Sequence, residues 1–322
     1  MTKIMKDQGL RLTLGPVLFN WAPEIWRDFY FRMADEAPVD RVVIGEIVCS
    51  KRTPFLAPYI PEVIERLQAA GREVMLASPI LVTLERERGA VRELVEQAGD
   101  LLIEANDMGC LAQLGGRPHH VGPYVNVYNE ATLAWMAGRG ALSFSLNGEL
   151  TATAVAALGR VTRSLGVELE VQVFGRLPLA ISVRCYHARS RGLHKDNCRF
   201  VCAEDADGLA VTTLDGESFL AVNGTQTLSH SHVALTAEVA DLHATGVNCL
   251  RLSPHSCDMV AVARIFRDLA DGAIDAAKAR AGLSALTGDA RLSNGFYHDR
   301  EGVADVFSGE TRTSGFVPMT RR

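Results

Sequence analysis

Short strand-like runs alternate with helix-like segments along most of this 322-residue chain. The run 41–49 (RVVIGEIVC), for example, precedes the helical pattern 61–71, where Pro61 favours a helix start and Gly71 favours a helix end. Repeated strand–helix units of this kind place parallel strands in a sheet whose faces are covered by the helices. The alternation therefore restricts the chain to an α/β fold, either a closed barrel or an open doubly wound sheet.

The number of strand-like runs and the missing nucleotide motifs favour the barrel. Seven runs precede residue 176, and an eighth at 248–254 (NCLRLSP) is followed by the helical pattern 259–280. No G-x-G-x-x-G follows the first run, and no G-x-x-x-x-G-K-[ST] occurs anywhere. We therefore expect a single TIM-like (β/α)8 barrel domain over residues 1–322. Residues 176–245 are predicted to be an insertion at the barrel mouth, between strands 7 and 8, with a cysteine-bearing loop and a β-hairpin around Asn223-Gly224.

The overall composition excludes several classes of protein. Hydrophobic residues make up 48% of the chain and charged residues 22%, which is typical of a globular domain. The net charge of -5 gives no basic excess, so we expect no nucleic-acid partner. No apolar run approaches the roughly 18 residues that a membrane span needs, and the first residues lack a signal-peptide pattern. The expected location is cytoplasmic.

The chain has seven cysteines, which is an odd count at irregular spacing and does not indicate a disulfide framework. Cys110 and Cys249 lie in apolar runs and are expected to be small buried residues. Cys185, Cys198 and Cys202 differ, because the segment 184–205 is polar and without apolar periodicity, which predicts a loop. A C-x12-C-x3-C spacing in such a loop can bring three sulfurs to one metal centre, which would then order the loop.

Both tetrahedral zinc and an iron–sulfur cluster need about four ligands, so a fourth must come from elsewhere. The candidates are Cys49, Cys257, His187 and His194. We favour Cys49, because it ends the second strand-like run while Cys185 follows the seventh, and the carboxyl ends of barrel strands meet at one rim. Cys257 is the runner-up, and His187 is a candidate to hydrogen-bond a bound sulfur.

Other polar residues stand at the ends of strand-like runs. Glu46 either orients a ligand or pairs with Arg52. His119 and His120 begin the fifth run, and a polar group follows it at Asn129. Such residues face a substrate or, more commonly, cap a loop. Lysines and arginines near the cysteines would favour their thiolate forms and offset the negative charge of a cluster; these are Lys51, Arg52, Arg184, Lys195 and Arg199.

The strand-end sequence VCSKR (48–52), the C-x12-C-x3-C group and the late segment SNGFYHD (293–299) together resemble the UbiU/UbiV group of the collagenase-like peptidase family. The resemblance runs over nearly the whole chain. It implies a [4Fe–4S] cluster whose iron is bound by four cysteines, a heterodimer with UbiU, and a role in the O2-independent hydroxylation of the aromatic ring of a ubiquinone precursor. Carried over to this sequence, the four ligands are Cys49, Cys185, Cys198 and Cys202.

One departure bears on activity. Peptidase-type members of the family carry His-Gly after the strand that ends here at Phe174, whereas this chain continues with Gly175-Arg176. No H-E-x-x-H or G-x-S-x-G motif occurs either, so peptidase activity is the least favoured function. The alternative to the iron–sulfur subunit is a zinc-stapled barrel that acts as a binding or scaffold subunit. The sequence does not identify catalytic residues, the oxygen donor or the electron donor.

Overall fold

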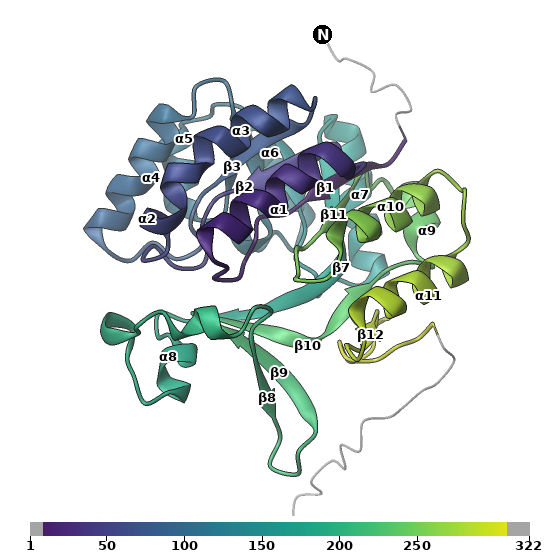
Figure 1. Cartoon of the computed structure of the whole chain (residues 1–322). Coiled ribbons are helices and arrows are strands. Elements are labelled where there is room, and N and C mark those ends of the chain that lie inside the picture. Colours follow the sequence, from purple (N-terminus) through teal and green to yellow (C-terminus); the bar gives the residue numbers. More distant parts are fainter. Residues whose placement is uncertain (1–8, 308–322) are drawn as a thin grey trace, which may run out of the picture.

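The computed structural model describes residues 9–307 and has the expected closed barrel at its centre (Figure 1). Eight parallel strands neighbour one another in chain order, and the last of them pairs with both the first and the seventh, which closes the sheet. The (β/α)8 prediction is therefore confirmed. The barrel strands are β1 (Arg11–Leu14), β2 (Arg41–Ile44), β3 (Glu73–Ala77), β4 (Leu102–Ala105), β5 (His119–Val121), β6 (Ala141–Ser145), β7 (Glu168–Ile181) and β11 (Cys249–Leu252).

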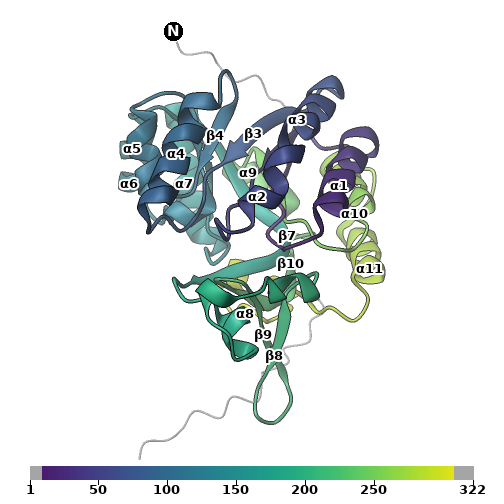
Figure 2. The ribbon, with the colours of Figure 1, turned by 60° about the vertical axis from the view of Figure 1, so that its left-hand side comes forward.

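Helices follow the strands and pack around the outside of the barrel (Figures 1 and 2). Several begin at a side chain whose oxygen accepts a backbone N–H of the first turn, as Asn129 does for Thr132 and Asp275 for Lys278. The helices of this layer are α1 (Pro23–Glu36), α2 (Thr53–Leu56), η1 (Ala57–Tyr59), α3 (Ile60–Ala69), α4 (Glu85–Gln97), α5 (Met108–Leu114), η2 (Pro123–Val125), α6 (Glu130–Ala137), α7 (Ala152–Leu165), α9 (Val239–Thr245), α10 (Met259–Ala270) and α11 (Ala276–Thr287). None of the helices between residues 9 and 307 has the length and hydropathy that crossing a membrane requires.

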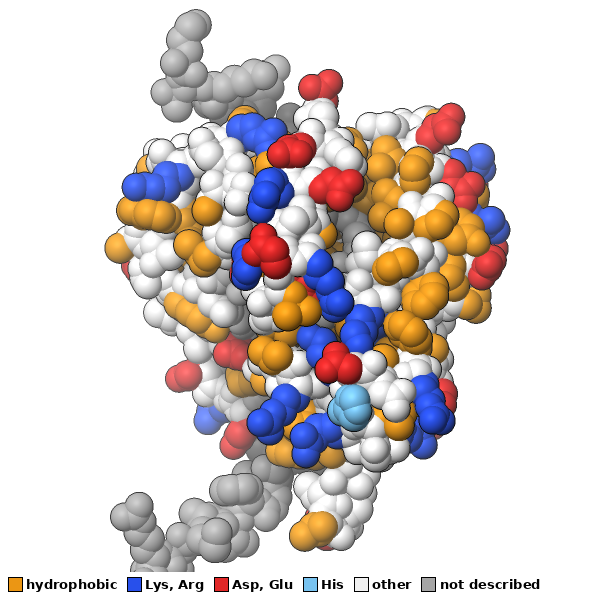
Figure 3. Space-filling view, turned by 90° about the vertical axis from the view of Figure 1, so that its left-hand side faces the viewer, with side chains coloured by type: hydrophobic (Ala, Val, Ile, Leu, Met, Phe, Trp, Pro, Cys, Tyr) orange, Lys and Arg blue, Asp and Glu red, His pale blue; other side chains and the backbone are white. Residues whose placement is uncertain are grey.

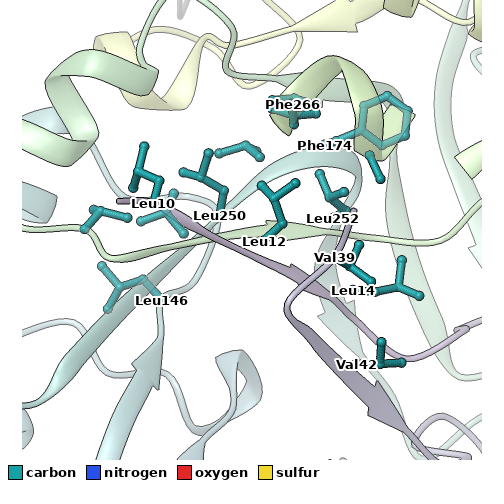
Figure 4. Close-up of a cluster of buried hydrophobic side chains, with 14 of the residues drawn as sticks. Leu10, Leu12, Leu14, Val39, Val42, Leu146, Phe174, Leu250, Leu252 and Phe266 are labelled. Carbon is teal, nitrogen blue, oxygen red and sulfur yellow. The ribbon is translucent and has the colours of Figure 1, made fainter. Parts of the chain in front are cut away.

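The main hydrophobic core lies between the strands and this helical layer. Leu12 and Leu14 of β1 and Leu250 and Leu252 of β11 are fully buried there, and Phe266 of α10 packs in the same cluster (Figure 4). Burial of each such side chain contributes about 1.5–3 kcal/mol. The apolar alternate residues of these strands thus face outward to the helices, which leaves the residues between them to fill the inside of the barrel.

The segment between β7 and β11 extends from one end of the barrel (Figures 1 and 2). β7 continues to Ile181 and pairs antiparallel with β10 (Gln226–Ala234), which pairs with β9 (Ser218–Asn223), and β9 with β8 (Leu209–Thr212). The turn between β9 and β10 follows Asn223 and contains Gly224 with φ +61°. Near the C-terminal side, β12 (Leu292–Ser293) pairs with β10 and precedes η5 (Phe296–His298).

Two local expectations need correction. The cysteine segment is not a plain loop, because it forms α8 (Tyr186–Ser190), η3 (Lys195–Asn197) and η4 (Val201–Glu204), single turns too short to show apolar periodicity. The second strand ends at Ile44 rather than at Cys49. Gly45 stops it with φ +141°, and a Cβ there would lie 2.9 Å from the carbonyl oxygen of Ala77.

Candidate metal centre

Four cysteines from separate parts of the chain line one cavity. Cys49 lies between β2 and α2, Cys185 directly precedes α8, Cys198 follows η3, and Cys202 is in η4. The cavity encloses about 340 Å³ free of protein atoms, part of it open to solvent. Cys185 and Cys202 are buried, and Cys49 and Cys198 are half-buried. The structure therefore brings together the four residues that the sequence singles out.

The backbone around Cys49 is held by Glu46. Its Oε1 accepts hydrogen bonds from the backbone N–H of Val48 at 2.8 Å and of Cys49 at 2.9 Å, and it lies 3.9 Å from Nη1 of Arg52. Burial raises the pKa of the Glu46 carboxyl. Both roles considered for Glu46 are thus present: the residue orients the Cys49 turn and pairs with Arg52.

Arg52 is a buried cation at the wall of the cavity. Its side chain is 1% exposed, with Nη1 donating to the carbonyl of Leu18 at 2.9 Å and Nη2 donating to Oδ1 of Asn223 at 3.1 Å. Its Nε–H has no acceptor within residues 9–307. Burial lowers the pKa of Arg52, but Glu46 and the nearby Cys202 outweigh this and raise it. A permanent positive charge therefore lies at the wall of a cavity lined by sulfur.

Further N–H groups surround the sulfurs. The backbone N–H of Ala188 donates to Sγ of Cys185, and Nδ2 of Asn20 donates to Sγ of Cys202, both at 3.4 Å. His187 also lines the cavity, but burial lowers its pKa and its Nε2 donates to Asp205 at 2.9 Å, so Nδ1 of the neutral ring is an acceptor without a partner among the described residues and not an N–H donor. Hydrogen bonds to cluster or thiolate sulfur are what tune such sites. Two of the four sulfurs therefore already accept an N–H group, which would stabilise negative charge on them.

The spacing of the sulfurs bears on which metal centre they suit. Tetrahedral zinc with Zn–S bonds of about 2.3 Å requires sulfurs only about 3.8 Å apart. Within residues 9–307, no three of the cysteine sulfurs lie within 4.8 Å of one another. A cubane binds each thiolate through a different iron at a different corner, so its ligands stand further apart than ligands of one ion. A single zinc ion would therefore require the cysteine sulfurs to move closer together than they lie here.

The surface over the cavity is rich in cations. Lys51 donates through Nζ to the carbonyl of Lys195 at 2.6 Å, which joins the Cys49 turn to the cysteine segment. Arg184, Arg189 and Arg199 are exposed and form no ion pair with any residue in 9–307. Figure 3 shows Lys and Arg side chains gathered over the lower part of the molecule on this side, where Figure 1 has α8. The local charge is thus opposite in sign to the net charge of the chain.

The remaining cysteines lie away from the cavity. Cys257 is half-buried, with its Sγ 3.8 Å from Sδ of Met259. Cys110 packs in the core beside α4, as expected. Cys249 is also fully buried, but its sulfur lies 3.7 Å from Nη1 of Arg41 rather than in purely apolar surroundings. His194 is exposed and does not line the cavity.

Sequence reasoning missed Asn20, Asp205 and Asn223, which hold Cys202, His187 and Arg52 respectively. Asn20 and Asp205 are single polar residues outside any motif, and Asn223 was recognised only as part of the Asn223-Gly224 hairpin signal, which does not reveal its contact with Arg52. Asn129 has the capping role that is the commoner one for such residues. His119 is held by the carbonyl of Arg117 at 2.7 Å, and His120 is buried inside the barrel.

Comparison with known proteins adds a family and several solved structures. The family model for peptidase family U32 matches residues 30–306. Phospho-2-dehydro-3-deoxyheptonate aldolase (DAHP synthase) from Thermotoga maritima is similar with a TM-score of 0.44 at 10% identity, covering 90% of this chain and 74% of that one. The tryptophan synthase complex from Pyrococcus furiosus gives 0.42 at 12% identity, covering 87% and 100%. Tryptophan synthase from M. tuberculosis gives 0.36 at 12% identity, covering 88% and 94%.

Proposed function

The chain belongs to peptidase family U32, and from this premise we propose that it is an iron–sulfur protein of the UbiV type. In this proposal Cys49, Cys185, Cys198 and Cys202 bind a [4Fe–4S] cluster. The protein acts with UbiU, as a heterodimer, in the O2-independent hydroxylation of the aromatic ring of a ubiquinone precursor. The family membership confirms the broader part of the sequence resemblance, whereas the UbiU/UbiV group, the cluster and the partner are the proposal.

The observation that carries the proposal is the convergence of the four cysteines on one cavity. The other three are 136 or more positions from Cys49, and a shared cavity for such distant thiols is hard to explain by packing alone. Burial raises the pKa of the thiols of Cys49 and Cys185, so both remain protonated in the absence of a bound metal. A cationic iron centre would reverse that preference and keep them as thiolates.

The charges around the cavity support an anionic occupant. Four thiolates on a cubane leave a net negative charge on the whole group. Arg52 presents a buried guanidinium, Lys195 lines the cavity, and Lys51 donates to the carbonyl of Lys195. These residues would offset the charge of the cluster and hold the Cys49 turn against the cysteine segment. When bound, the cluster would supply one-electron redox chemistry or a Lewis-acidic iron to the reaction.

The zinc-stapled scaffold is the competing function, because four thiolates also bind zinc. The sulfur spacing described above favours the cluster, since a zinc ion would require the three segments to move closer together. Metal analysis of protein purified without oxygen separates the two. We expect brown protein with roughly four iron and four acid-labile sulfide per chain. Colourless protein with one zinc per chain would refute the cluster.

The ligand set is tested by single substitutions. Cys49→Ala should lose iron as severely as Cys198→Ala, because each removes one of four corner ligands. Cys257→Ala is the matched control and should keep its iron, because its sulfur lies against Met259 away from the cavity. Iron and sulfide are measured per chain after anaerobic purification. Loss of iron from the Cys257 variant with retention in the Cys49 variant would contradict the assignment of the fourth ligand.

The biological role is tested by copurification with UbiU and an anaerobic assay of precursor hydroxylation. We expect the pair to form and to give hydroxylated product without O2, and the Cys49 variant to give none. Cleavage of an unfolded protein by the same preparation is the test of the function that the family name suggests. If the protein carries the cluster but neither binds UbiU nor supports hydroxylation, the cluster assignment stands and the proposed role in ubiquinone biosynthesis is refuted.

A further inference from the structure

The inside of this barrel is polar and charged. In barrels of this class the interior is usually filled by branched apolar side chains. Here Glu104 of β4, His120 of β5 and Glu170 of β7 are each at most 1% exposed. β4 and β7 are not neighbours in the sheet, so side chains from both can approach each other only across the interior. Arg251 of β11 makes that approach explicit, because its Nη1 donates to Glu104 at 2.7 Å and to Glu170 at 2.8 Å.

His120 has no hydrogen-bond partner although it lies between the two carboxylates. Its Nε2 is 3.9 Å from Oε2 of Glu104 and 3.8 Å from Oε1 of Glu170, which is too far for a hydrogen bond. Both ring nitrogens and Oε2 of Glu170 are buried without a partner among the described residues. The hydroxyl of Ser143, the residue opposite His120 in the register with β6, is unpartnered as well. Native interiors rarely leave so many polar atoms unsatisfied in one place, so the gap indicates a missing bound group.

The buried charges favour a cation in this gap. At the amino-terminal end of the barrel, Arg11 and Arg41 pair with Glu73 and Glu168, two positive charges against two negative. In the next layer Arg251 faces two carboxylates, so one negative charge is left without a cation. A buried charge of this kind is costly unless it is compensated.

The donor set identifies the kind of cation. We propose that Glu104, His120 and Glu170 form a binding site for one first-row divalent ion, Mn²⁺, Fe²⁺ or Zn²⁺, inside the barrel. One imidazole nitrogen and two carboxylate oxygens are ligands of these ions, whereas Mg²⁺ and Ca²⁺ prefer oxygen alone. The three ligand atoms lie within 4.8 Å of one another. Bonds of about 2.0–2.2 Å in tetrahedral geometry put ligand atoms about 3.4 Å apart, so the distances of 3.9 and 3.8 Å from Nε2 of His120 to the two carboxylates must each shorten by about half an ångström.

Arg251 is not itself a ligand in this proposal, but its hydrogen bonds hold the two ligand carboxylates in place. It contacts both oxygens of Glu104, through Nη1 and through Nη2 at 3.1 Å, and holds Glu170 through Oε1 only. Oε2 of Glu170 is thus left without a contact from Arg251. Carboxylate ligands in metal sites are commonly held by such hydrogen bonds. Arg251 also lines a small cavity together with Tyr124 and Ser253, so the cavity lies next to the residue that holds both carboxylates.

The site is tested with Mn²⁺ alone, because thiolates bind this ion poorly and the cysteine centre will not compete. The full chain is titrated anaerobically, and free Mn²⁺ is counted by electron paramagnetic resonance. We expect one bound Mn²⁺ per chain, and an affinity at least about tenfold lower in His120→Asn. His119→Asn is the matched control and should bind as the unmodified protein does, because the His119 ring is held by a backbone carbonyl. Glu170→Gln is a second ligand variant.

Folding of each variant is checked by the unfolding temperature without metal. Mn²⁺ should raise that temperature in the unmodified protein and in His119→Asn, and not in His120→Asn, since an ion that binds only the folded state stabilises it. If Glu170→Gln fails to fold, His120→Asn decides alone, because it leaves both carboxylates with Arg251. No binding by the unmodified protein, or equal binding by His120→Asn and His119→Asn, would overturn the proposal. Iron and sulfide at the cysteines are unaffected by either result, so this site and the proposed cluster stand or fall separately.

Discussion

Replacing Glu87 by Gln should destabilise the protein at neutral pH and weaken the turn that holds Cys49. Glu87 is buried in the first turn of α4. Its Oε2 accepts from the backbone N–H of Thr83 at 2.7 Å and of Leu84 at 2.9 Å, while its Oε1 accepts from Oγ of Ser50 at 2.8 Å. The carboxylate therefore connects α4 to the residue that follows Cys49.

The expected loss of stability can be estimated from the lowered pKa of the Glu87 carboxyl. Burial alone would raise the pKa of Glu87, but the hydrogen bonds from Thr83, Ser50 and Leu84 outweigh it and lower the pKa from 4.5 to about 2. That difference corresponds to about 3 kcal/mol of preference for the charged form in the folded state. A neutral amide keeps part of the hydrogen bonding, so we expect Glu87→Gln to lower the free energy of unfolding at pH 7 by about 2–3 kcal/mol.

The effect of Glu87→Gln on stability should depend on pH, in a direction that follows from the lowered pKa. A carboxyl whose pKa is depressed on folding contributes stability above its unfolded pKa and loses it as the pH falls through the folded value. The difference between the unmodified protein and Glu87→Gln should therefore be full at pH 7 and shrink as the pH falls from about 4.5 towards 2. Urea unfolding at pH 7, 5 and 3.5 measures it. Iron content after anaerobic purification reports the effect on the Cys49 turn, and we expect it to fall.

Glu85→Gln is the matched control. Glu85 stands in the same turn of α4, but its side chain is 75% exposed and its partner is the exposed Arg88. Exposed ion pairs contribute little, so this change should alter stability by less than about 0.5 kcal/mol at any of the three pH values. An equal loss in the two variants, or a loss in Glu87→Gln that is the same at pH 7 and pH 3.5, would refute the reasoning.

Two further predictions concern packing and capping. Gly159→Ala should destabilise the protein by about 1–3 kcal/mol, because the added Cβ would lie 2.1 Å from the carbonyl oxygen of Thr245. Gly89→Ala in α4 has no atom within 4 Å of the added Cβ and should stabilise the protein by about 0.5–1 kcal/mol, because Ala favours the helix more than Gly does. Thermal unfolding should show shifts of opposite sign for the two variants. Asn129→Ala removes the N-cap of α6, where Oδ1 of Asn129 accepts from the N–H of Thr132 at 2.9 Å, and should lower the free energy of unfolding in urea by about 1 kcal/mol. Asn129→Asp keeps a capping oxygen and should lower it little. Equal losses in the two variants would exclude capping as the cause.

The barrel could be predicted because its signal is local. Each strand-like run and each helical pattern can be recognised from neighbouring residues, and the right-handed strand–helix–strand rule then leaves few topologies. Boundaries are set by contacts from elsewhere in the chain. β2 ends at Gly45, whose φ of +141° leaves the strand conformation and whose missing Cβ makes room for the carbonyl of Ala77; the glycine in the run 41–49 allows such a break, but the run does not show which residue approaches it.

The cysteine cavity was predictable to the same degree and for a related reason. The carboxyl ends of barrel strands share one rim, so residues that follow β2 and β7 are near each other wherever the strands end. That geometry explains why Cys49 is found with Cys185 although β2 is shorter than expected. The identity of the bound group does not follow from the same rule, because spacing along the chain does not fix the distances between sulfurs.

The surroundings of the cavity could not be predicted, because long-range pairs decide them. Arg52 was expected to be one of several cations near the cysteines, yet it is buried by Leu18 and by Asn223, which lies 171 positions away. The interior of the barrel likewise depends on long-range pairs. Arg251 pairs with Glu104 across 147 positions, and neither residue stands in a motif. Charged residues within apolar strands are the only sequence signal of such buried pairs, and the sequence does not show which residues they pair with.

The two buried arginines carry opposite implications for what binds beside them. Arg52 keeps an unused donor at a cavity whose outer wall is cationic, which suits a group of net negative charge. Arg251 uses Nη1 and Nη2 on two carboxylates and still leaves one negative charge uncompensated, which suits a cation. Interior charges are screened far less than surface ones, so neither imbalance can be relieved by dissolved salt. The charges beside the two arginines therefore agree with the proposed anionic cluster at the barrel rim and the proposed divalent ion in the barrel interior, and exchanging the two proposed occupants would worsen both imbalances.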